Sequence, residues 1–196
     1  MIATTADRGT RRAPARGRRI AALLGALERL ALACTPLQRR LVADHARAVA
    51  DLLPAIACLS GQDPSTLPRQ PWSIAVVGGG LFPRTALALA RVWPAARVTI
   101  VDADADHLEQ ARRVLAAHHV TDVTFIHATW DPRVPHRHDL VVLPLALVGD
   151  RDAVYTAAGA PRLVHDWVWR RRGRAGVVVA WWLLKRLNLA ADASAH

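Results

Sequence analysis

The spacing of hydrophobic residues divides the chain into a helical N-terminal part and an alternating part that begins at Trp72. From Trp72 onward, short runs rich in valine and isoleucine alternate with stretches of helical periodicity, which is typical of a parallel sheet with crossover helices. The predicted strands are Ser73–Val77, Arg97–Asp102, Val123–His127, Asp139–Leu143, Arg162–His165 and Val177–Leu183. The predicted helices between them are Arg84–Trp93 and Asp106–His118. The pattern therefore predicts an α/β fold with a doubly wound, mostly parallel sheet of about six strands, the last one antiparallel in a hairpin with the fifth.

Residues 20–59 carry the spacing of two amphipathic helices. The first is predicted to end near Cys34. The second is predicted to begin at Thr35–Gln38, because a capping threonine, a proline in the first helical position and a glutamine in the third favour a helix start. Pro54 is predicted to bend or stop this helix near Leu53. We expect the two helices to form an arm that closes over a pocket as a lid or serves a homodimer interface.

Composition shifts set the remaining boundaries. Residues 1–19 hold six arginines against one acid and are predicted to be a disordered basic tail. Residues 60–71 are rich in Gly, Pro, Ser, Thr and Gln and are predicted to be a linker. Residues 72–196 then form the α/β domain.

The start of the chain shares features with an export signal, since arginines precede the apolar run Ile20–Leu27 and a Leu-Ala-Cys sequence ends at Cys34. Glu28 and Arg29 interrupt the apolar stretch and fit the polar side of an amphipathic helix. The other apolar run, Gly176–Leu184, has about half of the ~20 residues that a spanning helix needs. We therefore expect a cytoplasmic protein without a membrane-spanning segment.

The net charge of +10 is the composition's main cue for nucleic acid or an anionic membrane as a partner. Six of the arginines lie in residues 1–19 and four more in Arg170–Arg174, and Lys185 is the only lysine, so the bias resembles codon usage as much as selected chemistry. Neither nucleic acid nor membrane is expected as a partner. The histidines and the two cysteines lack metal-ligand spacing, so no metal site is expected either.

A glycine-rich turn carries the chemistry. The first predicted strand runs directly into Gly78–Thr85, with the sequence GGGLFPRT, and the second predicted strand ends in Asp102. Glycines let the backbone approach a ligand where a Cβ would clash, and an acid at the end of the second strand accepts hydrogen bonds from two ribose hydroxyls. A dinucleotide fingerprint would place its third glycine at 83, where Pro83 has no N–H for a pyrophosphate. The site therefore favours a Rossmann-like pocket for a nucleoside ligand without phosphates, such as S-adenosylmethionine, over NAD or FAD.

Residues 72–183 resemble the class I S-adenosylmethionine-dependent methyltransferases. The matching pieces are Val77–Gly80, Val101–Asp104 with Leu108–Arg112, Val123–Thr129 and Asp139–Pro144. The resemblance implies S-adenosylmethionine as the cofactor, held by Gly78, Gly79, Gly80, Phe82, Thr85, Asp102, Ala103, Thr129, Trp130, Leu143 and Pro144. Two positions depart from the family pattern, because Val76 stands where an acid is usual and Phe82 where the third glycine is usual. The methionine end of the cofactor is therefore expected to be held differently.

The turn, written G-x-G-x-x-P-x-T, also resembles that of nicotianamine synthases, which transfer the aminocarboxypropyl group of the same cofactor. Leu145–Asp150 looks like theirs as well. The expected function is methyl transfer to a small molecule. The alternatives are transfer or intramolecular cyclisation of the aminocarboxypropyl group, with release of methylthioadenosine, and a binding protein without turnover.

Three residues are candidates for catalysis. His165 and Asp166 lie at the end of the fifth predicted strand, where ligands bind in open α/β sheets. Tyr155, the only tyrosine, lies in the loop region that follows the fourth strand. The structural alternatives are a partly buried strand-end histidine, an acid that caps the next turn and a packing tyrosine. His45 is either a base carried on the lid or a core histidine bonded to a backbone carbonyl.

Overall fold

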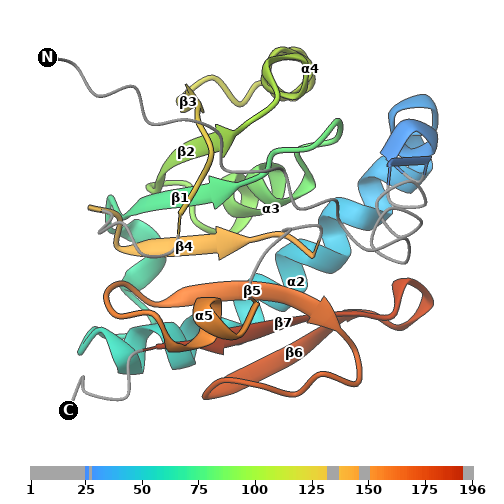
Figure 1. Ribbon diagram of the computed structural model, residues 1–196. Coiled ribbons are helices and arrows are strands. Elements are labelled where there is room, and N and C mark those ends of the chain that lie inside the picture. The colour runs from blue at the N-terminus through green and yellow to red at the C-terminus, as the bar shows by residue number, and fades with distance from the viewer. Residues whose placement is uncertain (1–24, 27, 132–136, 146–150, 192–196) are drawn as a thin grey trace, which may run out of the picture.

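A seven-stranded sheet forms the centre of the molecule (Figure 1), in the strand order β3-β2-β1-β4-β5-β7-β6. The computed structural model describes residues 25, 26, 28–131, 137–145 and 151–191, so the predicted tail at residues 1–19 lies outside the described residues. The strands are β1 Ser73–Val77, β2 Arg97–Asp102, β3 Val123–His127, β4 Leu140–Leu143, β5 Arg162–Trp167, β6 Ala175–Ala180 and β7 Lys185–Ala190. Strands β1 to β5 pair in parallel, whereas β7 runs antiparallel to both β5 and β6. The prediction of a mostly parallel α/β sheet is confirmed.

The predicted strand count was wrong at the C-terminal end. The run predicted as one strand, Val177–Leu183, divides into the end of β6 and a short 3-10 helix, η2, at Trp181–Leu183. Leu184 then takes a left-handed conformation, with φ of 52°, and the chain turns back into β7. The strand next to β5 is therefore β7, inserted between β5 and β6, and not the strand that directly follows β5 in the chain. The sequence KRLNLA did not indicate a buried strand, because three of the six buried residues of β7 are polar.

Helices cover both faces of the sheet. They are α2 Thr35–Leu59, α3 Arg84–Val92, α4 Ala105–Ala117 and α5 Arg151–Thr156, and residues 25, 26 and 28–33 are helical as well. Successive strand residues point to opposite faces, so Ile74 and Val76 pack in the core shared with α2, α3 and α4, while Ala75 and Val77 pack in a second cluster with Val154 of α5. We call these the α2 face and the α5 face of the sheet.

Helix α2 continues past Pro54, so the predicted stop near Leu53 was wrong. A proline inside a helix removes one hydrogen bond and costs about 3 kcal/mol. Here Pro54 lies on the exposed side of α2, while Ile56 and Ala57 beyond it are fully buried in the core that α2 shares with the sheet. Burial of this last turn offsets the cost of the proline, and α2 packs against α3, β6 and β7 as a regular layer of the fold.

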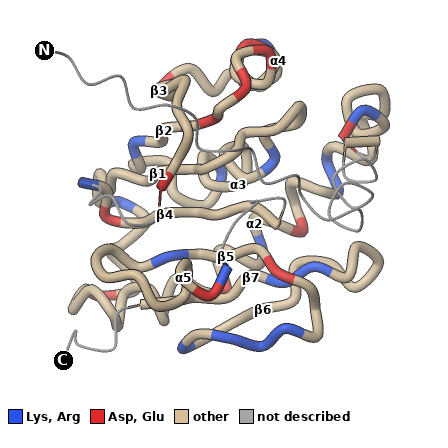
Figure 2. Tube along the Cα trace, in the orientation of Figure 1, with Lys and Arg blue, Asp and Glu red and all other residues tan. Residues whose placement is uncertain are grey.

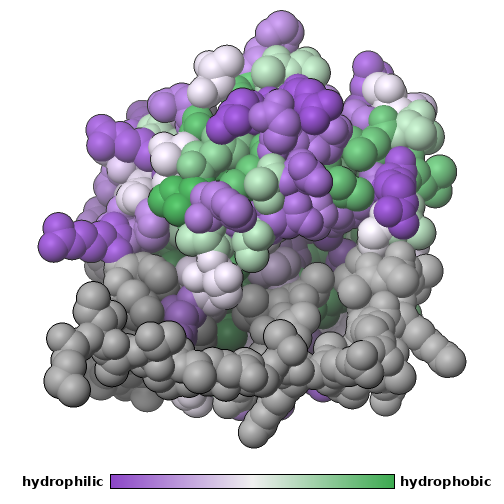
Figure 3. Space-filling model, turned by 45° about the horizontal axis from the view of Figure 1, so that its top comes forward, coloured by the Kyte–Doolittle hydropathy of each residue, from purple (hydrophilic) through white to green (hydrophobic). Residues whose placement is uncertain are grey.

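Figure 2 shows charged residues spread over the helices, the loops and the strands. Residues Arg170–Arg174 lie in the chain between β5 and β6, and β6 is the edge strand at the side of the sheet opposite β3. On the face drawn in Figure 3, polar side chains in purple and apolar ones in green are interspersed. Among the described helices, none has both the length and the apolar character needed to cross a bilayer.

We expect Ile56→Ala to lower the free energy of unfolding by roughly 2 to 5 kcal/mol, since it removes a fully buried side chain from the α2 core. Urea denaturation followed by circular dichroism measures the change. Leu30→Ala is the control, because Leu30 is 57% exposed. Equal stability of the two variants would show that the turn after Pro54 is not packed in the core.

Candidate functional site

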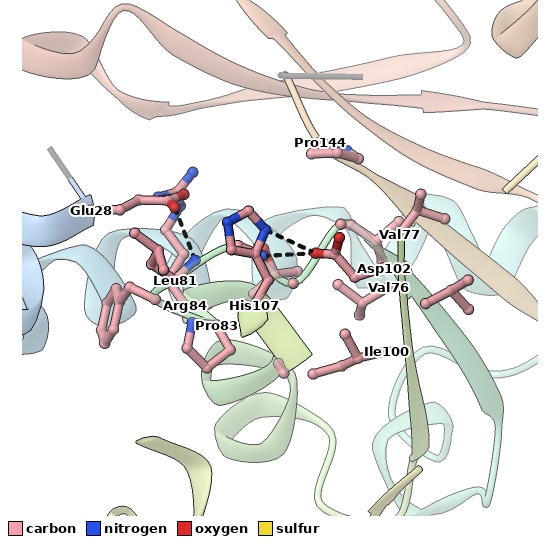
Figure 4. Close-up of a pocket in the computed structure, with 18 of the residues that line it drawn as sticks. Glu28, Val76, Val77, Leu81, Pro83, Arg84, Ile100, Asp102, His107 and Pro144 are labelled. Atoms are coloured by element: carbon pink, nitrogen blue, oxygen red, sulfur yellow. Dashed lines mark hydrogen bonds and ion pairs between the residues drawn. The ribbon is translucent and has the colours of Figure 1, made fainter. Parts of the chain in front are cut away.

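A cavity of about 560 Å³ lies at the carboxyl ends of β1, β2 and β4. Its volume is in the range of small-molecule sites, and this edge is where open α/β sheets bind ligands. The glycine turn after β1 forms its floor, and Ala128–Trp130 after β3 and Pro144 after β4 add further walls. Figure 4 shows the cavity with the side chains that converge on it.

The glycine turn depends on glycine at all three positions. Gly78 and Gly80 have φ of 68° and 60°, in the left-handed region that residues with a Cβ seldom adopt. A Cβ on Gly79 would lie 2.8 Å from Cγ2 of Ile100 in β2. The turn is therefore folded tightly onto β2 and presents backbone to the cavity.

Asp102, the last residue of β2, is held beside this turn. One carboxylate oxygen accepts a hydrogen bond from the Gly80 N–H at 3.3 Å and the other from the Asp104 N–H at 3.0 Å. Nδ1 of His107, in the first turn of α4, lies 3.6 Å from the carboxylate (Figure 4). Only 10% of the Asp102 side chain is exposed, so the carboxylate is a fixed acceptor aimed along the cavity.

Glu28 brings a second carboxylate to the turn, from a segment far away in the sequence. Its Oε2 accepts a hydrogen bond from the Leu81 N–H at 3.1 Å, and its Oε1 lies 3.5 Å from Nη1 of Arg84 (Figure 4). Sequence reasoning missed this residue as part of the site. Its one signal was that it interrupts an apolar run, which also fits any amphipathic helix. Glu28 supplies an acid at the turn, whereas Val76, the position where the family that the sequence resembles has an acid, is apolar.

The inner wall of the cavity carries Lys185 and His165. Because β7 is antiparallel to β5, its first residue, Lys185, pairs with Trp167 at the end of β5 and so reaches the carboxyl edge of the sheet. Lys185 is 1% exposed, and burial, followed by the positive charge of Arg84, lowers its pKa to about 7. Within the described part of the chain its Nζ has no hydrogen-bond partner. The sequence pattern did not indicate Lys185 as a site residue, because it did not indicate the strand that carries this residue, β7.

Two buried histidines adjoin the inner wall. The rings of His165 on β5 and His45 on α2 have centroids 5.1 Å apart. Nδ1 of His45 lies 3.0 Å from the Leu41 carbonyl oxygen, to which it can donate, as in the core alternative for this residue. Burial lowers the pKa of both histidines well below the ordinary value, and the positive charge of Arg84 lowers it further. Both rings are therefore neutral at neutral pH.

Most of the residues predicted to hold a cofactor meet in this cavity. Ten of them line it: Gly78, Gly79, Gly80, Phe82, Thr85, Asp102, Ala103, Thr129, Trp130 and Pro144. Leu143 does not, because it is fully buried in the cluster on the α5 face.

The predicted catalytic residues separate onto the two faces of β5. His165 points to the α2 face and lines the cavity, whereas Asp166, one residue later, points to the α5 face. There Asp166 accepts a hydrogen bond from the Tyr155 hydroxyl at 3.1 Å, and Asn188 donates to the same hydroxyl at 2.9 Å. Tyr155 lies in helix α5 rather than in a loop. Neither Asp166 nor Tyr155 lines the cavity.

Burial, and with it the Asp166 carboxylate, raises the pKa of Tyr155 to about 12. The hydroxyl therefore keeps its proton at neutral pH and serves as a donor in a polar network between β5, β7 and α5. Within the residues that the structure describes, no three His, Cys, Asp or Glu side chains come together as a metal site would require.

Solved structures with a similar fold come from more than one group of proteins. The YcgJ protein from Bacillus subtilis has 22% identity over 50% of this chain and 44% of its own, with a TM-score of 0.40. The nicotianamine synthase MtNAS, in complex with MTA and tNA, has 17% identity over 91% of this chain and 78% of its own, with a TM-score of 0.49. The mitomycin 7-O-methyltransferase MmcR has 20% identity over 63% of this chain and 38% of its own, with a TM-score of 0.43. The chain thus matches less than half the length of YcgJ and of MmcR.

No protein-family model matches the sequence, and no curated protein matches it significantly. At these identities the similarity to solved structures concerns the fold alone. The sheet of the structure itself, in the order β3-β2-β1-β4-β5-β7-β6, agrees with the predicted mostly parallel α/β fold apart from the number of strands.

The two buried histidines predict acid sensitivity. Below the ordinary histidine pKa of 6.5, the unfolded chain binds protons at these positions that the folded chain excludes. The free energy of unfolding therefore falls as pH falls through that value, by up to ~1.4 kcal/mol per pH unit for each histidine. We expect His165→Leu to show a shallower fall than wild type in urea denaturation between about pH 7.5 and pH 5.

The control for this measurement is His118→Gln, which replaces an exposed histidine and is expected to keep the wild-type dependence. The same pH dependence in all three proteins would contradict the assignment of His165 as a neutral buried residue.

Proposed function

We propose that this protein is an S-adenosylmethionine-dependent transferase that methylates a small molecule. The observation that carries the proposal is the convergence of three features on one cavity: the tight glycine turn, the fixed carboxylate of Asp102 and the Ala128–Trp130 wall. The resemblance assigns these features to the methionine part, the ribose and the adenine of the cofactor, in that order.

The start of α3 favours a ligand without phosphates. A phosphate bound at a helix N-terminus needs free N–H groups and no competing negative charge. Here the Leu81 N–H donates to Glu28, Pro83 has no N–H, and the Glu28 carboxylate itself lies at this position. The same carboxylate attracts a cation, and the amino group of an amino-acid tail fits that requirement.

Each part of the proposed cofactor thus has a candidate partner. Asp102 holds the ribose hydroxyls, Trp130 borders the adenine, and Glu28 with Arg84 holds the amino and carboxylate groups of the tail. The cofactor supplies an electrophilic carbon attached to a sulfonium. The chain's own contribution is to position the acceptor in line with that carbon, exclude water and receive a proton where the acceptor carries one.

Aminocarboxypropyl transfer or cyclisation is the second candidate. The observation that favours it is the turn itself, where Pro83 caps α3 and the acid at the tail comes from Glu28, so that charged groups lie beside the amino-acid end of the ligand. Products separate the two reactions, since methyl transfer leaves S-adenosylhomocysteine and the alternative leaves methylthioadenosine.

We expect Asp102→Ala to weaken binding of S-adenosylmethionine roughly tenfold or more, because a charged acceptor of hydrogen bonds is lost. Isothermal titration calorimetry measures the dissociation constant. Asp122→Ala, at an exposed site outside the cavity, is the charge-matched control and is expected to bind like wild type. Unchanged affinity of Asp102→Ala would refute the ribose assignment, and the absence of wild-type binding would refute the proposed function.

Glu28→Gln tests the tail assignment. We expect roughly a tenfold loss of affinity for S-adenosylmethionine, since the carboxylate that pairs with the amino group becomes neutral. Methylthioadenosine, which lacks the amino-acid tail, is the control ligand, and its affinity is expected to stay the same. Equal losses for both ligands would place the effect of Glu28 on the glycine turn and not on the tail.

The reaction is identified with S-adenosylmethionine that carries a deuterated methyl group, incubated with the protein and a low-molecular-weight cell extract. Mass spectrometry is expected to show unlabelled S-adenosylhomocysteine and a deuterated product. Deuterated methylthioadenosine would instead establish the second candidate. Asp102→Ala, assayed in parallel, controls for turnover by other components.

A further inference from the structure

The only lysine of the chain lies at the inner end of the cavity. Lys185 opens β7, and the antiparallel insertion of that strand brings it to the edge of the sheet where β1, β2 and β4 end. The side chain is 1% exposed, and no described residue offers an acceptor to Nζ. An unpartnered amine that borders a cavity is accessible to a ligand in that cavity and to little else.

The surroundings of Lys185 oppose a positive charge. Its partners across β5 and β6, Trp167 and Ala180, carry no charge. The guanidinium of Arg84 on α3 repels the Lys185 ammonium. The Glu28 carboxylate attracts the ammonium, but its Oε1 already lies 3.5 Å from Nη1 of Arg84.

The remaining polar neighbours do not provide an acceptor charge either. His45 of α2 and His165 of β5 are neutral and bring no negative charge to Lys185. Burial, followed by the positive charge of Arg84, therefore favours the neutral amine of Lys185.

We propose that Lys185 is the catalytic base of the site, receiving the proton that the acceptor loses as it attacks the cofactor. This inference rests on the proposed transferase function and adds to it that the acceptor is a nucleophile with a dissociable proton, such as an amine or a hydroxyl. It applies equally to methyl and to aminocarboxypropyl transfer.

The step balances without any further reactant. The lone pair of the acceptor's nitrogen or oxygen forms the new bond to the electrophilic carbon, and the carbon–sulfur bond breaks with its electron pair going to sulfur, which becomes a neutral thioether. The acceptor's proton passes to the neutral Nζ of Lys185, which becomes an ammonium. Release of that proton to solvent after product departure restores the base.

The chemistry of the side chain supports a base rather than an anchor for an anion. Arginine stays protonated at any pH that proteins experience, whereas a buried lysine can lose its proton. The wall already contains the guanidinium of Arg84 as a permanent cation. Lys185 is the one group on the wall that combines a basic amine with the absence of a partner among the described residues.

Because Lys185 is the only lysine, it can be titrated without ambiguity. We expect the Nζ and Cε resonances of protein labelled with ¹³C,¹⁵N-lysine to titrate with a midpoint about 7, where burial and Arg84 place the pKa. Lys185→Met removes the resonance and assigns it. A midpoint near the ordinary lysine value of 10.5 would overturn the proposal, since the amine would then be protonated at neutral pH.

The same sample tests whether Lys185 faces the ligand. Saturating S-adenosylhomocysteine is expected to shift the resonance, and S-adenosylmethionine is expected to give a lower titration midpoint than S-adenosylhomocysteine, because its sulfonium adds a positive charge to the cavity. Binding confirmed by calorimetry without any shift of the resonance would overturn the proposal. Absence of binding in calorimetry would refute the proposed function instead, so the two failures are distinct.

Lys185→Arg separates a base from an anchor for an anion in the deuterium-transfer assay. If Lys185 is a base, we expect both Lys185→Arg and Lys185→Met to lose at least ~100-fold in rate while they still bind S-adenosylhomocysteine. If Lys185 instead binds an anion through its positive charge, Lys185→Arg would keep the wild-type rate, and that result would overturn the proposal. The pH profile of the wild-type rate is expected to rise through the midpoint measured by NMR.

Discussion

The direction of β7 is the constraint on which the site depends. In a parallel sheet only the carboxyl ends of the strands reach the edge where the glycine turn lies. Strand β7 runs the other way, so its first residue arrives at this edge beside the last residue of β5. The alternation of side chains along β5 then selects His165 for the cavity and sends Asp166 to the opposite face. Backbone geometry thus decides which polar side chains a ligand meets.

The wall of the cavity combines several nitrogen groups with two described carboxylates, those of Glu28 and Asp102. Burying uncompensated charge costs free energy, and proteins avoid the cost by pairing the charge or by removing it. Here Arg84 is paired with Glu28, while His45, His165 and Lys185 favour their neutral forms. The free-energy cost of burying charge therefore affects both the stability of the folded chain and the protonation states of the side chains at its site.

Local patterns predicted the parts of the site that are built locally. The glycine turn follows a strand, and Asp102 ends the next one, so adjacency in the chain already placed them together. Glu28 and Lys185 could not be placed in this way, because Glu28 reaches the turn across about a quarter of the chain and Lys185 depends on a strand whose polar residues resemble a loop. The end of α2 was predicted wrongly for a related reason. Burial of Ile56 in the core outweighed the local tendency of Pro54 to end the helix.

The hydrogen bond between Glu28 and the Leu81 N–H ties the helical residues 28–33 to the floor of the cavity. The carboxylate that would hold a ligand's amino group therefore belongs to the same segment that must stay docked for the site to be complete. By thermodynamic linkage, whatever favours docking of this segment tightens the ligand, and the ligand favours docking by the same factor. Occupancy of the cavity by a ligand is thus coupled to protection of the backbone amides near Glu28 from hydrogen exchange, so that the two increase together.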